Sequence, residues 1–133
     1  MPLSDVFLIF CAAMVLAAAL LHALDGKRVL NDLLAQPNEY FQSHRAHFCL
    51  RALFYTGALL YVIFAAYLVA NITGNGYTER VVLIGTAFGI GSVGAITAFR
   101  CRYDRNNWPH MHAHSIFHAL IAGSALAAMV SQL

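Results

Sequence analysis

Four long apolar stretches constrain this chain more than any other feature of its sequence. They cover residues 6–24, 50–70, 81–99 and 115–130, each approximately. Each has close to the ~20 residues that a helix needs to cross ~30 Å of hydrocarbon. Because 60% of the 133 residues are hydrophobic and only 11% are charged, little sequence remains for a soluble domain. We therefore predict an all-α protein, a four-helix transmembrane bundle, in which residues 1–133 form a single membrane domain.

The first apolar stretch has the position of a secretory signal peptide, but its flanks differ from one. Ser4 and Asp5 precede it where a signal peptide has basic residues, and no convincing cleavage site follows before Lys27. We predict that this stretch is retained as a helix.

The basic residues indicate how the bundle is oriented. They gather at the first and third connections, as Lys27, Arg28, Arg45 and Arg51 and as Arg100, Arg102 and Arg105, whereas the second connection has only Arg80. The positive-inside rule then places both termini on the non-cytoplasmic side. We expect a multi-pass protein of the bacterial inner membrane. The net charge of +2 is small and the chain has no Gly-rich phosphate loop, so we predict no nucleic-acid partner.

The first connection is long and contains apolar residues at helical spacing. Leu30, Leu33 and Leu34 recur on one face before Pro37 ends the pattern. This spacing predicts a short amphipathic helix over about residues 28–36, lying on the membrane interface.

Histidines concentrate at the predicted cytoplasmic end of the bundle. His114 and His118 are four residues apart, so a helix places them on one face, at the start of the fourth stretch. His22 ends the first stretch and His47 precedes the second. Three neutral imidazoles and a water form the ligand set of an open, catalytic zinc site. We predict zinc ligation by His114, His118 and either His22 or His47.

Carboxyl and hydroxyl groups near these histidines suggest catalytic roles. Zinc makes its bound water a nucleophile near neutral pH. Asp25 is three residues from His22 and is a candidate to accept the proton of that water, as is Asp32. Ser43 or Ser115 is a candidate to hydrogen-bond the water or an oxyanion.

The same histidines allow other interpretations. Two histidines from different helices are also the axial ligands of b-type haem. In a third interpretation no cofactor is bound, and the histidines contact lipid headgroups or a neighbouring subunit.

The third apolar stretch carries a packing motif. Gly85 and Gly89 form a small-x-x-x-small face, which lets another helix approach closely in lipid. Its partner is either the fourth helix or another subunit, so we predict a homo- or hetero-oligomer formed through this face, among membrane lipids. This motif supports an alternative function, a small non-catalytic subunit of a larger membrane complex that binds haem or a pigment.

The segment His114-Ser115-Ile116-Phe117-His118 resembles the last transmembrane helix of the superfamily that includes alkaline ceramidases and the progestin and adipoQ receptors. That helix reads His-x-x-x-His, and Ser43-x-x-x-His47 looks like the early Ser-x-x-x-His of the family. The resemblance implies zinc held near the cytoplasmic face by three histidines, His47 among them, with a Ser and an Asp assisting. It also implies hydrolysis of lipid amides, and we take a zinc-dependent lipid amide or ester hydrolase as the leading hypothesis.

Overall fold

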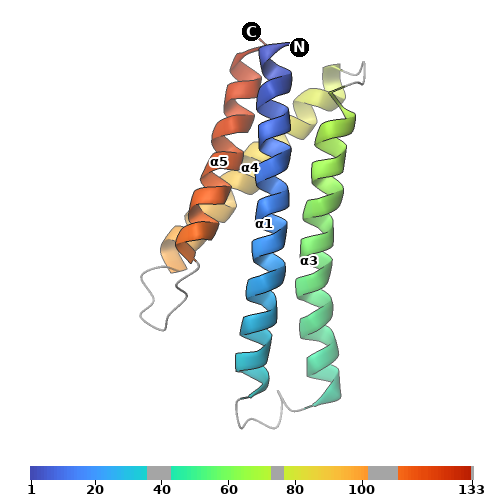
Figure 1. The fold of residues 1–133 in the computed structure, drawn as a ribbon, viewed down its shortest axis with the longest axis vertical. Coiled ribbons are helices and arrows are strands. Elements are labelled where there is room, and N and C mark those ends of the chain that lie inside the picture. The colour runs from blue at the N-terminus through green and yellow to red at the C-terminus, as the bar shows by residue number, and fades with distance from the viewer. Residues whose placement is uncertain (36–42, 73–76, 102–110, 133) are drawn as a thin grey trace.

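The computed structural model describes residues 1–35, 43–72, 77–101 and 111–132. These residues form four long helices, α1 (Leu3–Leu34), α3 (His44–Ala70), α4 (Tyr77–Cys101) and α5 (Met111–Val130). Each helix is long and apolar enough to cross a membrane, as the sequence predicts. The two termini lie at the same end of the molecule (Figure 1). Which side of the membrane this end faces stays a prediction.

The four helices share one core, with α1 at its centre. Helix α1 packs against both α3 and α5, and α4 packs mainly against α5 (Figure 1). All four contribute fully buried side chains, which include Leu8, Leu68, Ile84 and Ile121. Many other large apolar side chains are exposed; Leu53 on α3, for example, is 68% exposed. This distribution suits lipid, which solvates apolar side chains as well as a protein core does.

Helices α1 and α3 extend beyond α4 and α5 at the end away from the termini (Figure 1). We call residues 26–34 of α1 and 44–53 of α3 the projecting hairpin. The expected interfacial helix over residues 28–36 is not separate where the structure describes it, because residues 28–34 continue α1 without a break; residue 36 lies outside the described residues. No proline interrupts the helix before Pro37, and Gly26 is accommodated where it faces the Phe54 ring on α3.

Close contact between α4 and α5 depends on two glycines that the sequence motif did not single out. A Cβ added at Gly91 would lie 2.5 Å from the backbone nitrogen of Ala122 and 2.8 Å from the carbonyl oxygen of His118. A Cβ at Gly94 would overlap the His118 ring. At Gly85 and Gly89, by contrast, a Cβ would have no neighbour within 4 Å. Helix α5 therefore packs on Gly91 and Gly94 of α4, and none of the described residues covers the predicted Gly85/Gly89 face.

An ion pair links α1 to α4 near the termini. The Arg80 guanidinium contacts the Asp5 carboxylate and donates a hydrogen bond of 3.1 Å to the Ser4 hydroxyl. These groups are largely buried, so the pair neutralises charges that would be costly at membrane depth.

We predict that Gly91→Ala destabilises the protein by about 1–3 kcal/mol, because backbone atoms of α5 block the new methyl group and α4 must shift. The matched control is Gly123→Ala on α5, where a Cβ meets nothing within 4 Å. Unfolding in detergent, followed by circular dichroism, measures both. Equal stabilities for the two variants would contradict the observed packing of α4 on α5.

Candidate functional site

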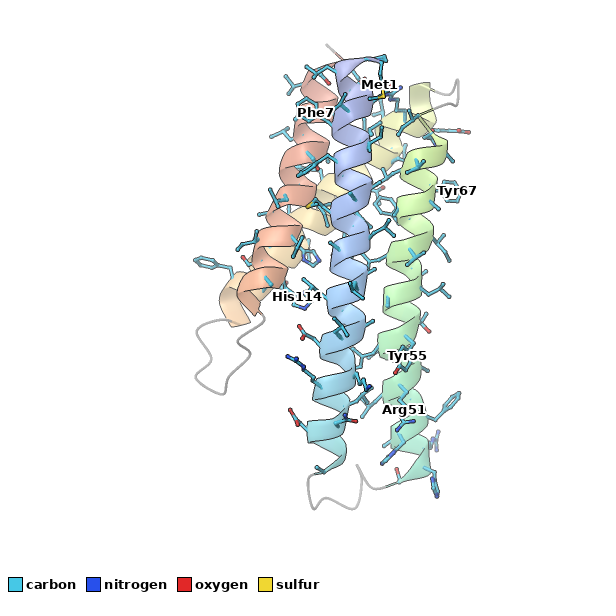
Figure 2. All side chains as sticks on the ribbon, in the orientation of Figure 1. Met1, Phe7, Arg51, Tyr55, Tyr67 and His114 are labelled. Atoms are coloured by element: carbon cyan, nitrogen blue, oxygen red, sulfur yellow. The ribbon has the colours of Figure 1, made fainter. Side chains whose placement is uncertain are left out.

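Five polar side chains from three helices gather near the projecting hairpin, and we call them the polar cluster. Its members are His22 and Asp25 on α1, Tyr61 on α3, and His114 and His118 on α5. Asp25, His114 and His118 are only 6–7% exposed. His114 points into the space between α5 and α1 (Figure 2). The structure therefore brings together four of the residues that the sequence singles out: His22, Asp25, His114 and His118.

The Asp25–His114 contact joins α1 to α5. The Asp25 Oδ2 and His114 Nε2 atoms are 2.7 Å apart, which is a short hydrogen bond or ion pair. A carboxylate is an acceptor only, so His114 carries its proton on Nε2 and donates it to Asp25. This bond satisfies a buried carboxylate that would otherwise carry a large desolvation cost.

The His118 ring is held in one tautomer. Its Nδ1 atom is 2.8 Å from the carbonyl oxygen of His114, and a carbonyl only accepts, so His118 Nδ1 carries the proton. In the neutral ring Nε2 is then left as an acceptor. The Tyr61 hydroxyl lies 2.9 Å from this Nε2 and donates to it, which joins α3 to α5. His118 is thus a base with a hydroxyl group already in place.

Two glycines make room for the histidine rings. A Cβ at Gly57 on α3 would lie 2.8 Å from His22 Nε2, and a Cβ at Gly94 on α4 would overlap the ring of His118. The His22 ring also packs against Tyr61, with ring centroids 6.1 Å apart. All four helices therefore shape the cluster. Sequence analysis missed Tyr61, Gly57 and Gly94, because nothing in their local spacing indicates which residue faces them.

The cluster lies toward one end of the bundle. The exposed Lys27 is two residues beyond Asp25, at the start of the projecting hairpin. Toward the termini, the described core consists largely of close-packed apolar side chains, such as Leu8, Val15 and Ile121. This packing separates the cluster from the end of the molecule that carries the termini.

Two predicted site residues lie away from the cluster. Ser43 caps α3, where its hydroxyl accepts a hydrogen bond of 3.2 Å from the Ala46 backbone N–H. His47 precedes Gly57 by ten residues, which corresponds to about 15 Å along a helix. Since Gly57 faces His22, His47 is too far along α3 to join His114 and His118. Of the two alternatives for the third histidine, the structure brings His22 close.

Ser115 follows His114 on α5 and is half-buried. Successive residues of a helix are about 100° apart around its axis, so Ser115 does not share the face of its neighbour. Its predicted catalytic role stays a prediction.

The arrangement of donors in the cluster bears on the zinc prediction. Within residues 1–35, 43–72, 77–101 and 111–132, no group of three or more His, Cys, Asp or Glu side chains is arranged to hold a metal ion. Instead, His114 Nε2 is hydrogen-bonded to Asp25, and His118 Nε2 is hydrogen-bonded to Tyr61. The described residues therefore do not fit a zinc ion in this conformation, and zinc and b-type haem remain predictions of the sequence.

Comparison with known proteins finds no family model, curated protein or solved structure that matches the chain. The resemblance of the last helix to the ceramidase and receptor superfamily stays a prediction.

We predict that His118 is the Nδ1–H tautomer and that Tyr61→Phe changes the signal of Nε2 but not that of Nδ1. ¹⁵N NMR of histidine-labelled protein measures both nitrogens, with His118→Gln to assign them. Tyr67→Phe, on an exposed face of the same helix, is the matched control. An Nε2–H tautomer for His118 would contradict the hydrogen-bond pattern described above.

Proposed function

We propose that this chain is a multi-pass membrane protein that hydrolyses an amide or ester of a lipid at the membrane face near the projecting hairpin. In this proposal His118 is the general base, and the Tyr61 hydroxyl is the group that it deprotonates. Asp25 and His114 are positioning residues, which fix α5 against α1.

One observation carries the proposal, the 2.9 Å contact between Tyr61 Oη and His118 Nε2. Hydrolases activate a hydroxyl group by placing it against an imidazole whose other nitrogen donates to a fixed oxygen. Here the fixed oxygen is the carbonyl of His114, 2.8 Å from His118 Nδ1. It takes the place that a carboxylate has in the serine hydrolases, and it orients the His118 ring.

The depth of the cluster favours a lipid substrate. Tyr61 lies deep in the span, about 14 Å along α3 from Ala70, where the opposite boundary lies. Asp25 is two residues inside the exposed Lys27 and marks the end of the cluster nearest the boundary between headgroups and hydrocarbon at the projecting hairpin. The ester and amide carbonyls of membrane lipids lie at this boundary. The Tyr61 side chain is itself only half-buried.

The chemistry requires two steps. Tyr61 Oη attacks the carbonyl carbon and transfers its proton to His118 Nε2, which then protonates the leaving amine or alcohol. Water next adds to the acyl–Tyr61 ester, with His118 accepting its proton, and the fatty acid leaves as Tyr61 regains its hydrogen.

We predict that Tyr61→Phe lowers hydrolysis of a short-chain ceramide or lipid ester at least 100-fold in proteoliposomes, the usual scale for loss of acid–base or nucleophilic assistance. The variant loses one interhelical hydrogen bond, worth about 0.6–2 kcal/mol, so the protein should remain folded. Release of fatty acid measures the rate, and mass spectrometry searches for the acyl–Tyr61 species.

The matched control for this experiment is His47→Ala, which removes a histidine outside the cluster and should leave the rate unchanged. Equal rates for the parent protein and Tyr61→Phe would contradict the proposal, as would a complete lack of hydrolysis by a well-folded parent. The same assay includes a chelator, since loss of activity that zinc restores would favour the zinc-dependent mechanism over the one proposed.

A second candidate function is supported by the outer face of α4. Gly85 and Gly89 are exposed, and a Cβ added at either would meet none of the described residues within 4 Å. A small-x-x-x-small face is nevertheless the type that packs closely on another helix in lipid. We propose that this face binds another subunit, either a second copy or a different chain. The protein is then a component of a larger membrane assembly.

We expect the double substitution Gly85→Ile and Gly89→Ile to abolish oligomers while leaving the monomer folded, because a Cβ at either position would meet none of the described residues within 4 Å. Chemical crosslinking in native membranes, followed by electrophoresis, reports the assembly. The control pair Val93→Ile and Ile96→Val conserves size on another exposed part of α4. Crosslinked species that survive the glycine substitutions would contradict the second candidate.

A further inference from the structure

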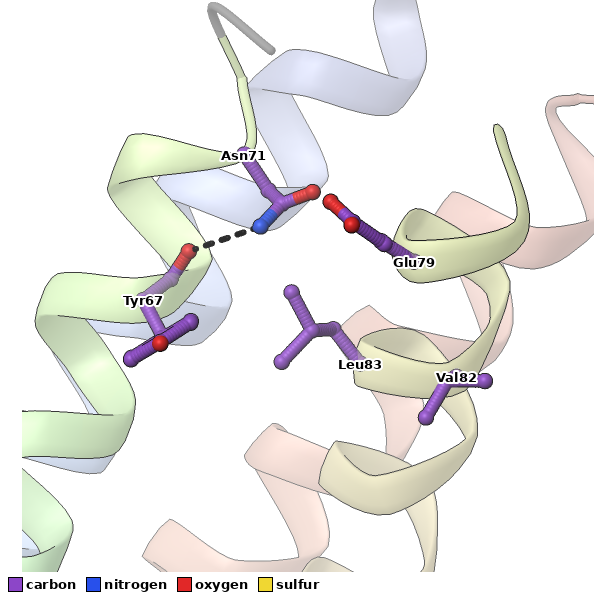
Figure 3. Close-up of a pocket in the computed structure, with 5 residues that line it drawn as sticks. All are labelled: Tyr67, Asn71, Glu79, Val82 and Leu83. Atoms are coloured by element: carbon purple, nitrogen blue, oxygen red, sulfur yellow. Dashed lines mark hydrogen bonds between the residues drawn. The ribbon is translucent and has the colours of Figure 1, made fainter. Parts of the chain in front are cut away.

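A groove opens between α3 and α4 at the end of the molecule that carries the termini. These two helices follow each other in the chain, yet their main packing partners are α1 and α5 respectively. The groove between them is lined by Tyr67, Asn71, Glu79, Val82 and Leu83 (Figure 3). It is separate from the polar cluster and takes no part in the proposed hydrolysis.

The groove is polar at its mouth and apolar below. The membrane-spanning part of α3 ends at Ala70 and that of α4 begins at Glu79, so Asn71 and Glu79 lie at the boundary of the hydrocarbon. Val82 and Leu83 lie about one turn further into the span. An occupant of this groove therefore has a polar group at the membrane surface and an apolar chain below it, which describes a lipid.

The polar groups at the mouth are both acceptors. Asn71 donates through Nδ2 to the Tyr67 carbonyl oxygen at 3.5 Å, which turns its own Oδ1 toward Glu79 (Figure 3). The Glu79 carboxylate is also an acceptor only. Among the described residues Glu79 forms no ion pair, and the neighbouring Arg80 is paired with Asp5. Two acceptors that face each other, one of them charged, favour a cationic donor between them, and a primary ammonium group supplies three donors and a compensating charge.

We propose that this groove binds one phospholipid whose headgroup ends in a primary ammonium. The ammonium lies between Glu79 and Asn71 Oδ1, and an acyl chain runs along Val82 and Leu83. A headgroup without a donor, such as trimethylated choline, forms a hydrogen bond with neither acceptor. An anionic headgroup is repelled by Glu79.

The test is competition between lipids for the full-length protein in detergent micelles. The protein is equilibrated with equal amounts of phosphatidylethanolamine, phosphatidylcholine and phosphatidylglycerol of identical acyl chains, and native mass spectrometry counts the retained lipid. We expect a preference of about tenfold or more for phosphatidylethanolamine, the scale of one hydrogen bond to a charged group. Glu79→Gln should reduce this preference to near onefold, and Leu83→Trp should reduce retention of all three lipids by filling the groove.

Asp32→Asn is the matched control. It removes one exposed carboxylate at the opposite end of the molecule, so it changes the net charge equally and should keep the preference. Equal retention of the three lipids by the parent protein would overturn the proposal. A preference that survives Glu79→Gln, or one that is lost equally in Asp32→Asn, would also overturn it, because the ammonium would then bind elsewhere or respond only to net charge.

Discussion

The hydrogen bond between Asp25 and His114 is the contact on which the rest of the polar cluster depends. A buried carboxylate in an apolar bundle has to find its partner within the protein, because lipid offers none. The 2.7 Å contact between Asp25 and His114 Nε2 fixes the position of α5 along the axis of α1. With α5 in this position, His118 lies one turn closer to the membrane centre than His114, and its Nε2 atom is 2.9 Å from the Tyr61 hydroxyl on α3. Two short contacts thus join three helices, and glycines opposite His22 and His118 allow the helices to approach around the rings.

The two ends of the bundle carry different chemistry, and an apolar core separates them. The projecting hairpin is rich in exposed basic residues and adjoins the polar cluster, whereas the end with the termini has the Asp5–Arg80 pair and the acceptor-lined groove. The core between them is close-packed around Leu8, Val15 and Ile121. This separation favours chemistry or binding at each surface over conduction across the membrane.

The sequence predicts the helices well and the site only in part, for physical reasons. Hydropathy locates the four spans because lipid imposes their length and composition. Residues three or four apart on one helix are neighbours, so the sequence alone predicts two parts of the cluster. One part is His114 with His118, and the other is His22 with Asp25. The sequence does not predict the roles of Tyr61, Gly57 and Gly94, because their partners are on other helices. Spacing within one helix does not determine the axial position of a neighbouring helix. The leucines after Gly26 suggested a separate helix, since periodicity does not distinguish an interfacial helix from the continuation of α1. Ser43 resembled a catalytic serine, but its position at a helix start is equally that of an N-cap.

A double-mutant cycle on Asp25 and His114 tests the central claim most directly. Unfolding free energies are measured in detergent for the parent protein, Asp25→Asn, His114→Gln and the double variant. If these side chains pair across α1 and α5, the two substitutions are not additive, and the cycle gives a coupling free energy of about 1 kcal/mol or more. Additive effects within about 0.3 kcal/mol would contradict the pairing, and with it the position of His118 beside Tyr61.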